Sequence, residues 1–179
     1  MNILVIEGSP HSRGSSNLLA TNFIQGATEA GNKVEVIDVG HANLHPCIGC
    51  DFCGMDGSCS QRDDMAEFRV KILSTDMAVF VMPLYYFGIP AQMKMFIDRW
   101  YAFTTRLTSR ELKTALICAA WDDENWTFKS LSLHYKTLCR YMHFKSLGEI
   151  YAGGCGTVSM TQESRWPKKA YEFGKSLCD

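Results

Sequence analysis

A turn rich in glycine and hydroxyl side chains occupies residues 8–17, which read Gly-Ser-Pro-His-Ser-Arg-Gly-Ser-Ser-Asn. The turn directly follows an apolar run and directly precedes a helical pattern. A helix that begins near Ser16 would point its free backbone N–H groups, and the positive end of its dipole, into the turn. Such an arrangement binds phosphate. The alternative is a polar turn in which Ser15 or Ser16 only caps the helix.

The glycine spacing of this turn narrows the choice of ligand. It is not G-x-G-x-x-G, which is typical of dinucleotide sites, and it is not G-x-x-x-x-G-K-[ST], which is typical of nucleoside triphosphate sites. A monophosphate held by hydroxyl groups and backbone amides is therefore the favoured ligand of the turn.

Four of the eight cysteines lie in one short stretch, spaced Cys47-x₂-Cys50-x₂-Cys53-x₅-Cys59. Three thiols at three-residue steps suit a compact cluster whose ligands come from one tight loop, and glycines at 49, 54 and 57 let the backbone bend around it. Zinc is the weaker alternative, because a four-cysteine zinc site normally uses two separate C-x₂-C pairs and here the pairs overlap. The run also differs from the bacterial ferredoxin motif in its last spacing. Free or oxidised thiols remain a further alternative.

Composition excludes several classes of protein. The 18 basic and 19 acidic residues nearly cancel, which argues against a nucleic-acid partner. No apolar run approaches the ~18 residues of a membrane span, and the start of the chain lacks the features of a signal peptide. We therefore expect a cytoplasmic protein without a membrane partner, whose thiols are reduced or bind metal. Four scattered cysteines are expected to be buried apolar residues: Cys118, Cys139, Cys155 and Cys178.

Alternating strand and helix patterns must position these residues. Apolar runs predict strands at 2–6, 33–39, 76–82, 113–120 and 147–151, each followed by a helix with an apolar stripe. This alternation predicts an α/β fold with a three-layer, doubly wound, five-stranded parallel sheet. The flavodoxin-like strand order 2-1-3-4-5 is the leading topology, and its ligand crevice lies at the carboxyl ends of strands one and three. Residues 1–179 then form one domain with a cysteine-rich loop inserted at about 41–62.

Aromatic residues follow the third predicted strand, in the sequence Pro83-Leu84-Tyr85-Tyr86-Phe87-Gly88. This loop lies beside the phosphate turn, because both loops leave the sheet at its switch point. A ligand with a phosphate at one end and flat rings at the other fits both loops, and FMN is such a ligand. The aromatic side chains would lie against the isoalloxazine rings, and backbone amides would bind their pyrimidine edge. A hydrophobic patch for dimer packing is the alternative, and both roles are compatible.

The first strand and its Gly-Ser-Pro turn, which closes on Ser16-Asn17 and Leu18-Leu19, resemble the flavodoxin-like NAD(P)H-dependent FMN reductase group. The string from Pro83 to Pro90, with Lys94 and Asp98-Arg99 beyond it, resembles the second flavin loop of that group and is the most specific match. The resemblance implies that three loops bind FMN. The residues that it assigns to the flavin are Ser9, His11, Arg13, Ser15, Ser16 and Asn17, then Pro83, Leu84, Tyr85, Tyr86, Phe87 and Gly88, and finally Ala120, Trp121 and Asp122.

The cysteine stretch is similar to that of the iron-sulfur flavoproteins within this group. The resemblance implies a [4Fe-4S] cluster beside the FMN, with Cys47, Cys50, Cys53 and Cys59 as its ligands. It also implies an oxidoreductase that passes electrons from NAD(P)H or a reduced redox protein to a small molecule or a redox-protein partner, as a homodimer or higher homo-oligomer. No side chain is assigned as a catalytic acid or base, because the flavin performs the chemistry. The rival functions are a non-enzymatic, flavodoxin-like electron carrier and a cysteine-loop protein that binds metal or senses redox state without a flavin.

Overall fold

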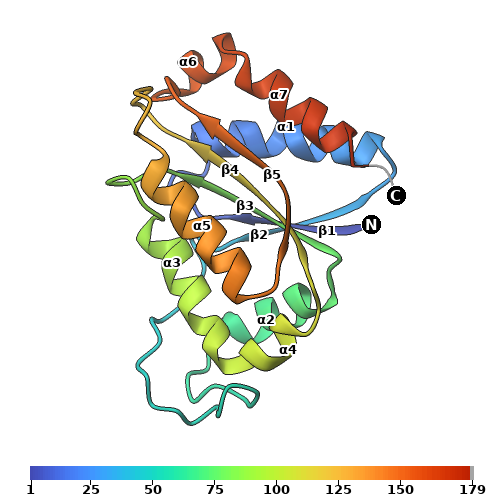
Figure 1. The fold of residues 1–179 in the computed structure, drawn as a ribbon, viewed down its shortest axis with the longest axis vertical. Helices are drawn as coiled ribbons and strands as arrows, with labels where there is room; N and C mark the ends of the chain where they lie inside the picture. Colours follow the sequence, from blue (N-terminus) through green and yellow to red (C-terminus); the bar gives the residue numbers. More distant parts are fainter. Residues whose placement is uncertain (178–179) are drawn as a thin grey trace.

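A five-stranded parallel sheet forms the centre of the computed structural model, which describes residues 1–177 (Figure 1). The strand order is β2-β1-β3-β4-β5, which confirms the predicted topology. The order reverses between β1 and β3, so the carboxyl ends of these two strands form the switch point of the sheet. The strands are β1 (Asn2–Glu7), β2 (Lys33–Asp38), β3 (Met77–Pro83), β4 (Lys113–Ala119) and β5 (Lys145–Ala152).

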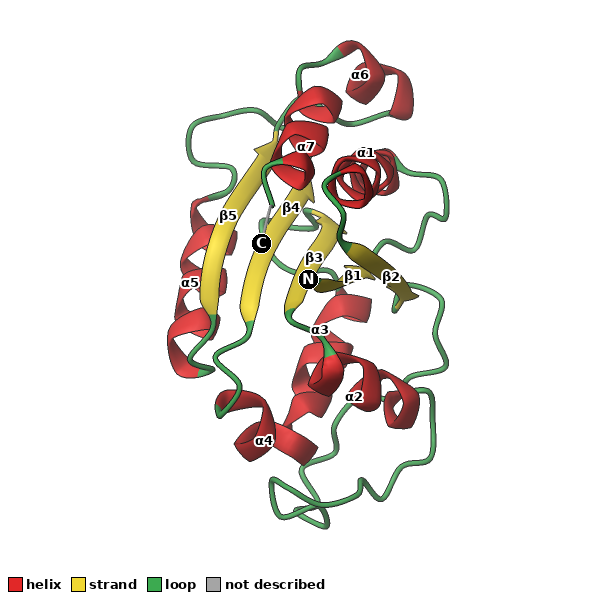
Figure 2. Ribbon diagram, turned by 90° about the vertical axis from the view of Figure 1, so that its right-hand side faces the viewer, coloured by secondary structure: helices red, strands yellow, loops and turns green. Residues whose placement is uncertain are grey.

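Helices cover both faces of the sheet (Figure 2). One face packs against α1 and α7, and the other packs against α2, α3, α5 and the 3₁₀ helix η1. The three central strands, β1, β3 and β4, are almost wholly buried, which explains their continuous apolar sequences. The edge strands β2 and β5 are partly exposed. The helices are α1 (Ser15–Glu29), α2 (Met65–Ser74), α3 (Ala91–Asp98), η1 (Arg99–Phe103), α4 (Thr104–Thr108), α5 (Lys129–Tyr141), α6 (Val158–Glu163) and α7 (Trp166–Lys175).

Two glycines allow α1 and α7 to approach each other closely. A Cβ atom built on Gly26 would lie 2.1 Å from the carbonyl oxygen of Tyr171, and one built on Gly174 would lie 2.2 Å from that of Phe23. Neither glycine therefore has room for a side chain. This contact fixes the position of α1, whose N-terminus forms part of the phosphate turn.

Pro90 and the apolar spacing from Met93 to Tyr101 predict one continuous helix after β3, and the observed helix differs from it in two details. Pro90 is the N-cap residue, and the helix itself begins one residue later at Ala91. At Arg99 the α-helix gives way to the 3₁₀ helix η1, which has about three residues per turn. This change of winding turns Tyr101 outward, where the structure has it 38% exposed and not in the core.

Two short helices, α4 and α6, have no counterpart in the sequence prediction, because five or six residues are too few to show a helical period. Three of the four scattered cysteines are buried as predicted, while Cys178 lies outside the described residues. Within residues 1–177, no helix is long and apolar enough to cross a membrane.

Candidate functional site

The phosphate turn is built around the amide side chain of Asn17. Its Oδ1 accepts the backbone N–H of Gly14 at 3.2 Å, and its Nδ2 donates to Glu7 Oε2 at 2.8 Å. Asn17 therefore ties the turn to the end of β1. Burial raises the pKa of Glu7 above its ordinary value, although the bond from Asn17 opposes this shift.

The turn leaves several donors available for a ligand. Helix α1 begins at Ser15, and the backbone N–H groups of Ser15, Ser16 and Asn17 have no protein acceptor within the part of the chain that the structure describes. These amides and the adjacent hydroxyl groups are the donor set that an anionic phosphate requires. Ser9 has a supporting role, since its hydroxyl oxygen lies 3.1 Å from both the N–H and the carbonyl oxygen of His11.

The turn after β2 holds the phosphate turn from the side. A Cβ atom on Gly40 would lie 2.1 Å from the carbonyl oxygen of Ser9, so these two backbones are in direct contact. His41 places Nδ1 2.8 Å from Asp38 Oδ2 and Nε2 3.1 Å from the carbonyl oxygen of Pro10. Both neighbours are acceptors, so only the doubly protonated imidazolium can donate to both. The hydrogen bond and the charge of Asp38 raise the pKa of His41 above its ordinary value.

We expect FMN affinity to fall as the pH rises above neutral, because His41 then loses its second proton and its hydrogen bond to Pro10. Because the pKa of His41 is raised, its stabilisation of the phosphate turn is complete below its ordinary pKa of 6.5. This stabilisation is lost as the pH rises through the pKa of His41 in the folded protein. The phosphate is already doubly ionised in this range. The dissociation constant, measured by quenching of FMN fluorescence, should depend less on pH in His41→Gln; an equally steep dependence in that variant would refute the expectation.

The two predicted flavin loops face one cavity of about 470 Å³ at the switch point of the sheet. Ten of the fifteen predicted flavin residues line it: Ser9, His11, Arg13, Ser15, Ser16, Pro83, Leu84, Tyr85, Ala120 and Trp121. The cavity is also lined by three residues of the β5–α6 loop and by the first residue of α6, which sequence reasoning did not assign: Cys155, Gly156, Thr157 and Val158.

The β5–α6 loop could have been found from its position. It begins at the carboxyl end of β5 with a glycine-rich stretch, and parallel strands bring all such ends to one edge of the sheet. The Cys155 N–H donates to the Ala120 carbonyl oxygen at 2.7 Å, which joins this loop to the loop after β4. The indole of Trp121 lies directly on Gly156, where a Cβ atom would be 2.1 Å from the ring.

Five predicted flavin residues do not line the cavity: Asn17, Tyr86, Phe87, Gly88 and Asp122. Asn17 positions the phosphate turn, as described above. Tyr86 is fully exposed, and the ring of Phe87 packs on Trp126 at a centroid distance of 4.8 Å. Asp122 accepts a hydrogen bond from the hydroxyl of Thr127. The last four of these five residues belong to the same loops as Tyr85 and Trp121, which do line the cavity.

The aromatic loop has backbone N–H groups that are available to a ligand. Leu84 donates its N–H to Ala119, and Tyr85 and Gly88 exchange backbone hydrogen bonds. The N–H groups of Tyr86 and Phe87 have no protein acceptor within residues 1–177, and both residues have positive φ angles, of 45° and 62°. The loop therefore offers two backbone donors beside the cavity.

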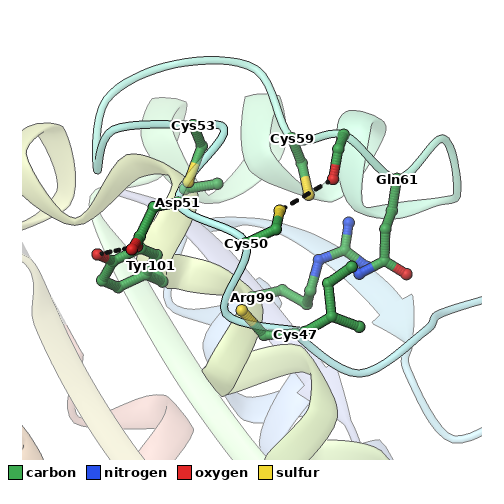
Figure 3. A pocket seen from close by; sticks show the side chains of 11 residues that line it. Cys47, Cys50, Asp51, Cys53, Cys59, Gln61, Arg99 and Tyr101 are labelled. Carbon is green, nitrogen blue, oxygen red and sulfur yellow. Dashed lines mark hydrogen bonds between the residues drawn. The ribbon is translucent and has the colours of Figure 1, made fainter.

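The cysteine-rich stretch, residues 41–62, contains neither helix nor strand. Its four cysteines line a second cavity, of about 20 Å³, together with Arg99 and Tyr101 of η1 (Figure 3). Tyr101 anchors the loop, because its hydroxyl donates to Asp51 at 2.8 Å. Gly49 and Gly54 have φ angles of 64° and 55°, which agrees with their predicted role in bending the loop.

The thiols of this loop face one cavity, although within the described residues no group of three or more histidine, cysteine or acidic side chains has the arrangement of a metal site. The Cys50 sulfur lies 3.3 Å from the Ser60 hydroxyl oxygen. This hydrogen bond lowers the pKa of the Cys50 thiol, which favours the thiolate form that binds metal.

A buried ion pair joins both ends of the cysteine loop to η1. Arg99 is 1% exposed, and its guanidinium donates to Asp63 at 2.5 and 3.0 Å and to the His45 carbonyl oxygen at 2.8 Å. Burial alone would lower the pKa of Arg99, but Asp63, with a smaller contribution from Cys59, raises it. The Arg99 Nε is buried without a hydrogen-bond partner in residues 1–177. A buried cationic donor beside four thiols fits an anionic metal–sulfur group.

The cysteine cavity and the flavin cavity share no lining residue. They lie near opposite ends of the segment formed by α3 and η1, with the aromatic loop at one end and the cysteine loop at the other (Figure 1). From Pro90 to Tyr101 this segment is roughly 17 Å long at 1.5 Å per residue. Within one chain the two cavities are therefore apart, whereas the resemblance implied a cluster beside the flavin.

Sequence comparison finds relatives whose names include both an iron-sulfur group and a flavin. An iron-sulfur flavoprotein of Methanocaldococcus jannaschii, MJ1083, is 35% identical over 99 residues, which cover 55% of this chain and 51% of that protein. An iron-sulfur flavoprotein of Archaeoglobus fulgidus is 32% identical over 108 residues, covering 60% of this chain and 49% of that protein. The matched segments span about half the length of these relatives.

Structural comparison finds the same fold at low sequence identity. An NAD(P)H:quinone oxidoreductase from Methanothermobacter marburgensis superposes with a TM-score of 0.82 at 22% identity, covering 99% of this chain and 96% of that one. An FMN-dependent NADH-azoreductase from Bacillus anthracis, solved with FMN, gives 0.75 at 15% identity, covering 99% of both chains. A family model described as flavodoxin-like fold matches residues 1–177. The chain therefore belongs to this flavodoxin-like family.

Proposed function

We propose that this chain is an FMN-dependent oxidoreductase that passes electrons from NAD(P)H or a reduced redox protein to a small acceptor or a redox partner. The observation that carries the proposal is the cavity of about 470 Å³ in which the phosphate turn and the aromatic loop face each other. Its size is within the range of small-molecule sites. The names of similar proteins, which include an NAD(P)H:quinone oxidoreductase and an FMN-dependent azoreductase, support this class of reaction.

Each part of the cavity has a role in this proposal. The amides and hydroxyl groups of Ser15 and Ser16, with Arg13, hold the phosphate, and Asn17 keeps their turn in place. Tyr85 and Trp121 flank the flat rings, and the free N–H groups of the aromatic loop bind the ring edge. Bound FMN supplies the redox chemistry, while the protein supplies position and electrostatics.

The proposal extends to the cysteine loop as the site of a [4Fe-4S] cluster held by Cys47, Cys50, Cys53 and Cys59. Its support is the common cavity of the four thiols, the buried Arg99 beside them, and the relatives named iron-sulfur flavoproteins. A cluster there would exchange electrons one at a time with a partner at the cysteine end of the molecule.

We also propose one FMN-binding domain over residues 1–179, with the cysteine loop at about 41–62 as an insertion, and an assembly of two or more copies. Exposed aromatic side chains gather around the flavin cavity and suit subunit packing. They are Tyr85, Tyr86, Phe87, Trp121 and Trp126. A sedimentation measurement of the mass in solution tests this assembly, and a monomer at micromolar concentration would contradict it.

The cofactors are tested by purifying the protein without exposure to air. We expect an absorbance spectrum with flavin and cluster contributions, and iron and acid-labile sulfide in equal amounts. Cys50→Ser should lose the iron and keep the flavin, because the two cavities share no residue. Cys139→Ser, which changes a buried cysteine outside the loop, is the matched control and should keep both. Flavin without iron in the wild type would refute the cluster, and a colourless protein that does not bind added FMN would refute the whole proposal.

A further inference from the structure

A larger cavity opens beside the cysteine cavity. It has a volume of about 940 Å³, near the upper end of the range for small-molecule sites, and it lies between the cysteine loop, α2 and η1. Cys59, Gln61 and Arg99, which Figure 3 shows around the cysteine cavity, line the larger cavity as well. Because these residues line both cavities, a molecule in the larger one would lie against the cysteine site. We call the larger cavity the arginine cleft.

The arginine cleft has an excess of positive charge. Three arginines and two aspartates line it, and Arg99 and Asp63 neutralise each other in their buried pair. Arg62 and Arg69 form no ion pair with any residue that the structure describes, and Asp64 is the only carboxylate left on the lining to offset them. Unpaired guanidinium groups offer a fork of donors that matches a carboxylate or a sulfonate.

Flat surfaces line the same cleft. Phe52, on the cysteine loop, lines the cleft with a ring that is 70% exposed. The Arg69 guanidinium carbon lies 5.4 Å from the centroid of the Phe103 ring, and Arg69 also donates to the carbonyl oxygen of Gly57. These contacts hold the planar guanidinium group of Arg69 on the wall of the cleft. Planar guanidinium groups and aromatic side chains stack on the faces of aromatic rings.

We propose that the arginine cleft binds a planar organic anion, in which the charged group pairs with Arg62 and the rings lie against Phe52 and Arg69. Binding itself does not depend on any cofactor. Its role rests on the proposed function: the cleft would let a small electron acceptor reach the cysteine site without entering the flavin cavity, which lies at the other end of α3 and η1.

The probe that tests this is anthraquinone-2-sulfonate, which is flat, carries one negative charge and has no carbon that adds thiols. Its affinity for the oxidised, FMN-saturated protein is measured by titration calorimetry without an electron donor. We expect binding to weaken about tenfold in Arg62→Gln, because one charge-assisted hydrogen bond is lost. Arg62 is exposed and makes no hydrogen bond to the described residues, so this variant should fold normally. Arg106→Gln is the matched control, because Arg106 contacts the cysteine loop at Asp56 but does not line the cleft.

Anthraquinone-2-sulfonamide, the uncharged analogue, should bind about tenfold more weakly than the sulfonate and should be insensitive to Arg62→Gln. The same affinity for both probes, the same affinity in the wild type and Arg62→Gln, or no binding to the wild type would each overturn the inference. Because no electron donor is present, the titration stands independently of turnover. Protein purified anaerobically without iron or flavin would instead refute the proposed function.

Discussion

Exchange of Arg99 for leucine will lower the free energy of unfolding by about 3–5 kcal/mol, because it leaves the Asp63 carboxylate buried without a counter-charge. The side chains of both residues are almost completely buried, at 1% and 0% exposure. The variant also loses the bond from Arg99 to the His45 carbonyl oxygen, which fixes the start of the cysteine loop. Urea denaturation of the protein, followed by circular dichroism, measures the difference.

The matched control for this prediction is Arg106→Leu. Arg106 also pairs with a carboxylate, that of Asp56, but both side chains are about half exposed, so its loss should change the stability little. Adding Asp63→Asn to Arg99→Leu should recover part of the loss, because it removes the unpaired charge. Similar effects of the Arg99 and Arg106 variants would contradict the interpretation.

The pKa of Asp63 also predicts how the stability difference between the wild type and Arg99→Leu depends on pH. Burial alone would raise the pKa of Asp63, but its bonds to Arg99 and to backbone amides lower it below the ordinary value of 3.8. Because the pKa of Asp63 is lowered, the stabilisation by the ion pair is complete above the ordinary pKa of Asp63. It is lost as the pH falls through the pKa of Asp63 in the folded protein. The gap in stability between the wild type and Arg99→Leu should therefore narrow as the pH falls, because protonation of Asp63 removes the unpaired charge from the variant and the ion pair from the wild type. A constant gap would show that the charge of Asp63 is not its cause.

Exchange of Ser15 for aspartate will weaken FMN binding on the order of a hundredfold or more, because two like charges close together cost several kcal/mol. Ser15 is the first residue of α1 and lines the flavin cavity. The same aspartate suits a helix N-terminus, so the apoprotein should unfold at an unchanged or higher temperature. Affinity and stability should thus move in different directions, which separates loss of the site from loss of the fold. Titration of FMN fluorescence and thermal unfolding of the apoprotein measure the two effects.

Two further variants complete this test. Thr21→Asp makes the same charge change on an exposed position of α1 outside the cavity and should leave FMN binding almost unchanged. Ser15→Ala removes only one hydroxyl group and should cost about tenfold in affinity. If Ser15→Asp bound FMN as well as the wild type, the phosphate would not lie at the start of α1 and the proposed site would fail.

Local sequence patterns were enough to predict the sheet and the helices on its two faces. A strand covered on both sides must be apolar along its whole length, and a helix on a sheet must be apolar along one stripe, so β3 and α1 are readable from local pattern alone. The strand order then follows from the handedness and connection rules of parallel sheets. That order placed residues 8–17 beside residues 83–88, and the cavity between them confirms the placement.

What the sequence could not supply are contacts between segments that share no local pattern. The sequence places the β5–α6 loop at the ligand edge of the sheet, but not the packing of Trp121 on Gly156, which joins this loop to the flavin cavity. The separation of the cysteine site from the flavin cavity is set by the length of α3 and η1, not by any motif. The buried pair of Arg99 and Asp63 links residues 36 positions apart, and such a pair has no signature in sequence because its energy comes from exclusion of water, which only the folded chain provides.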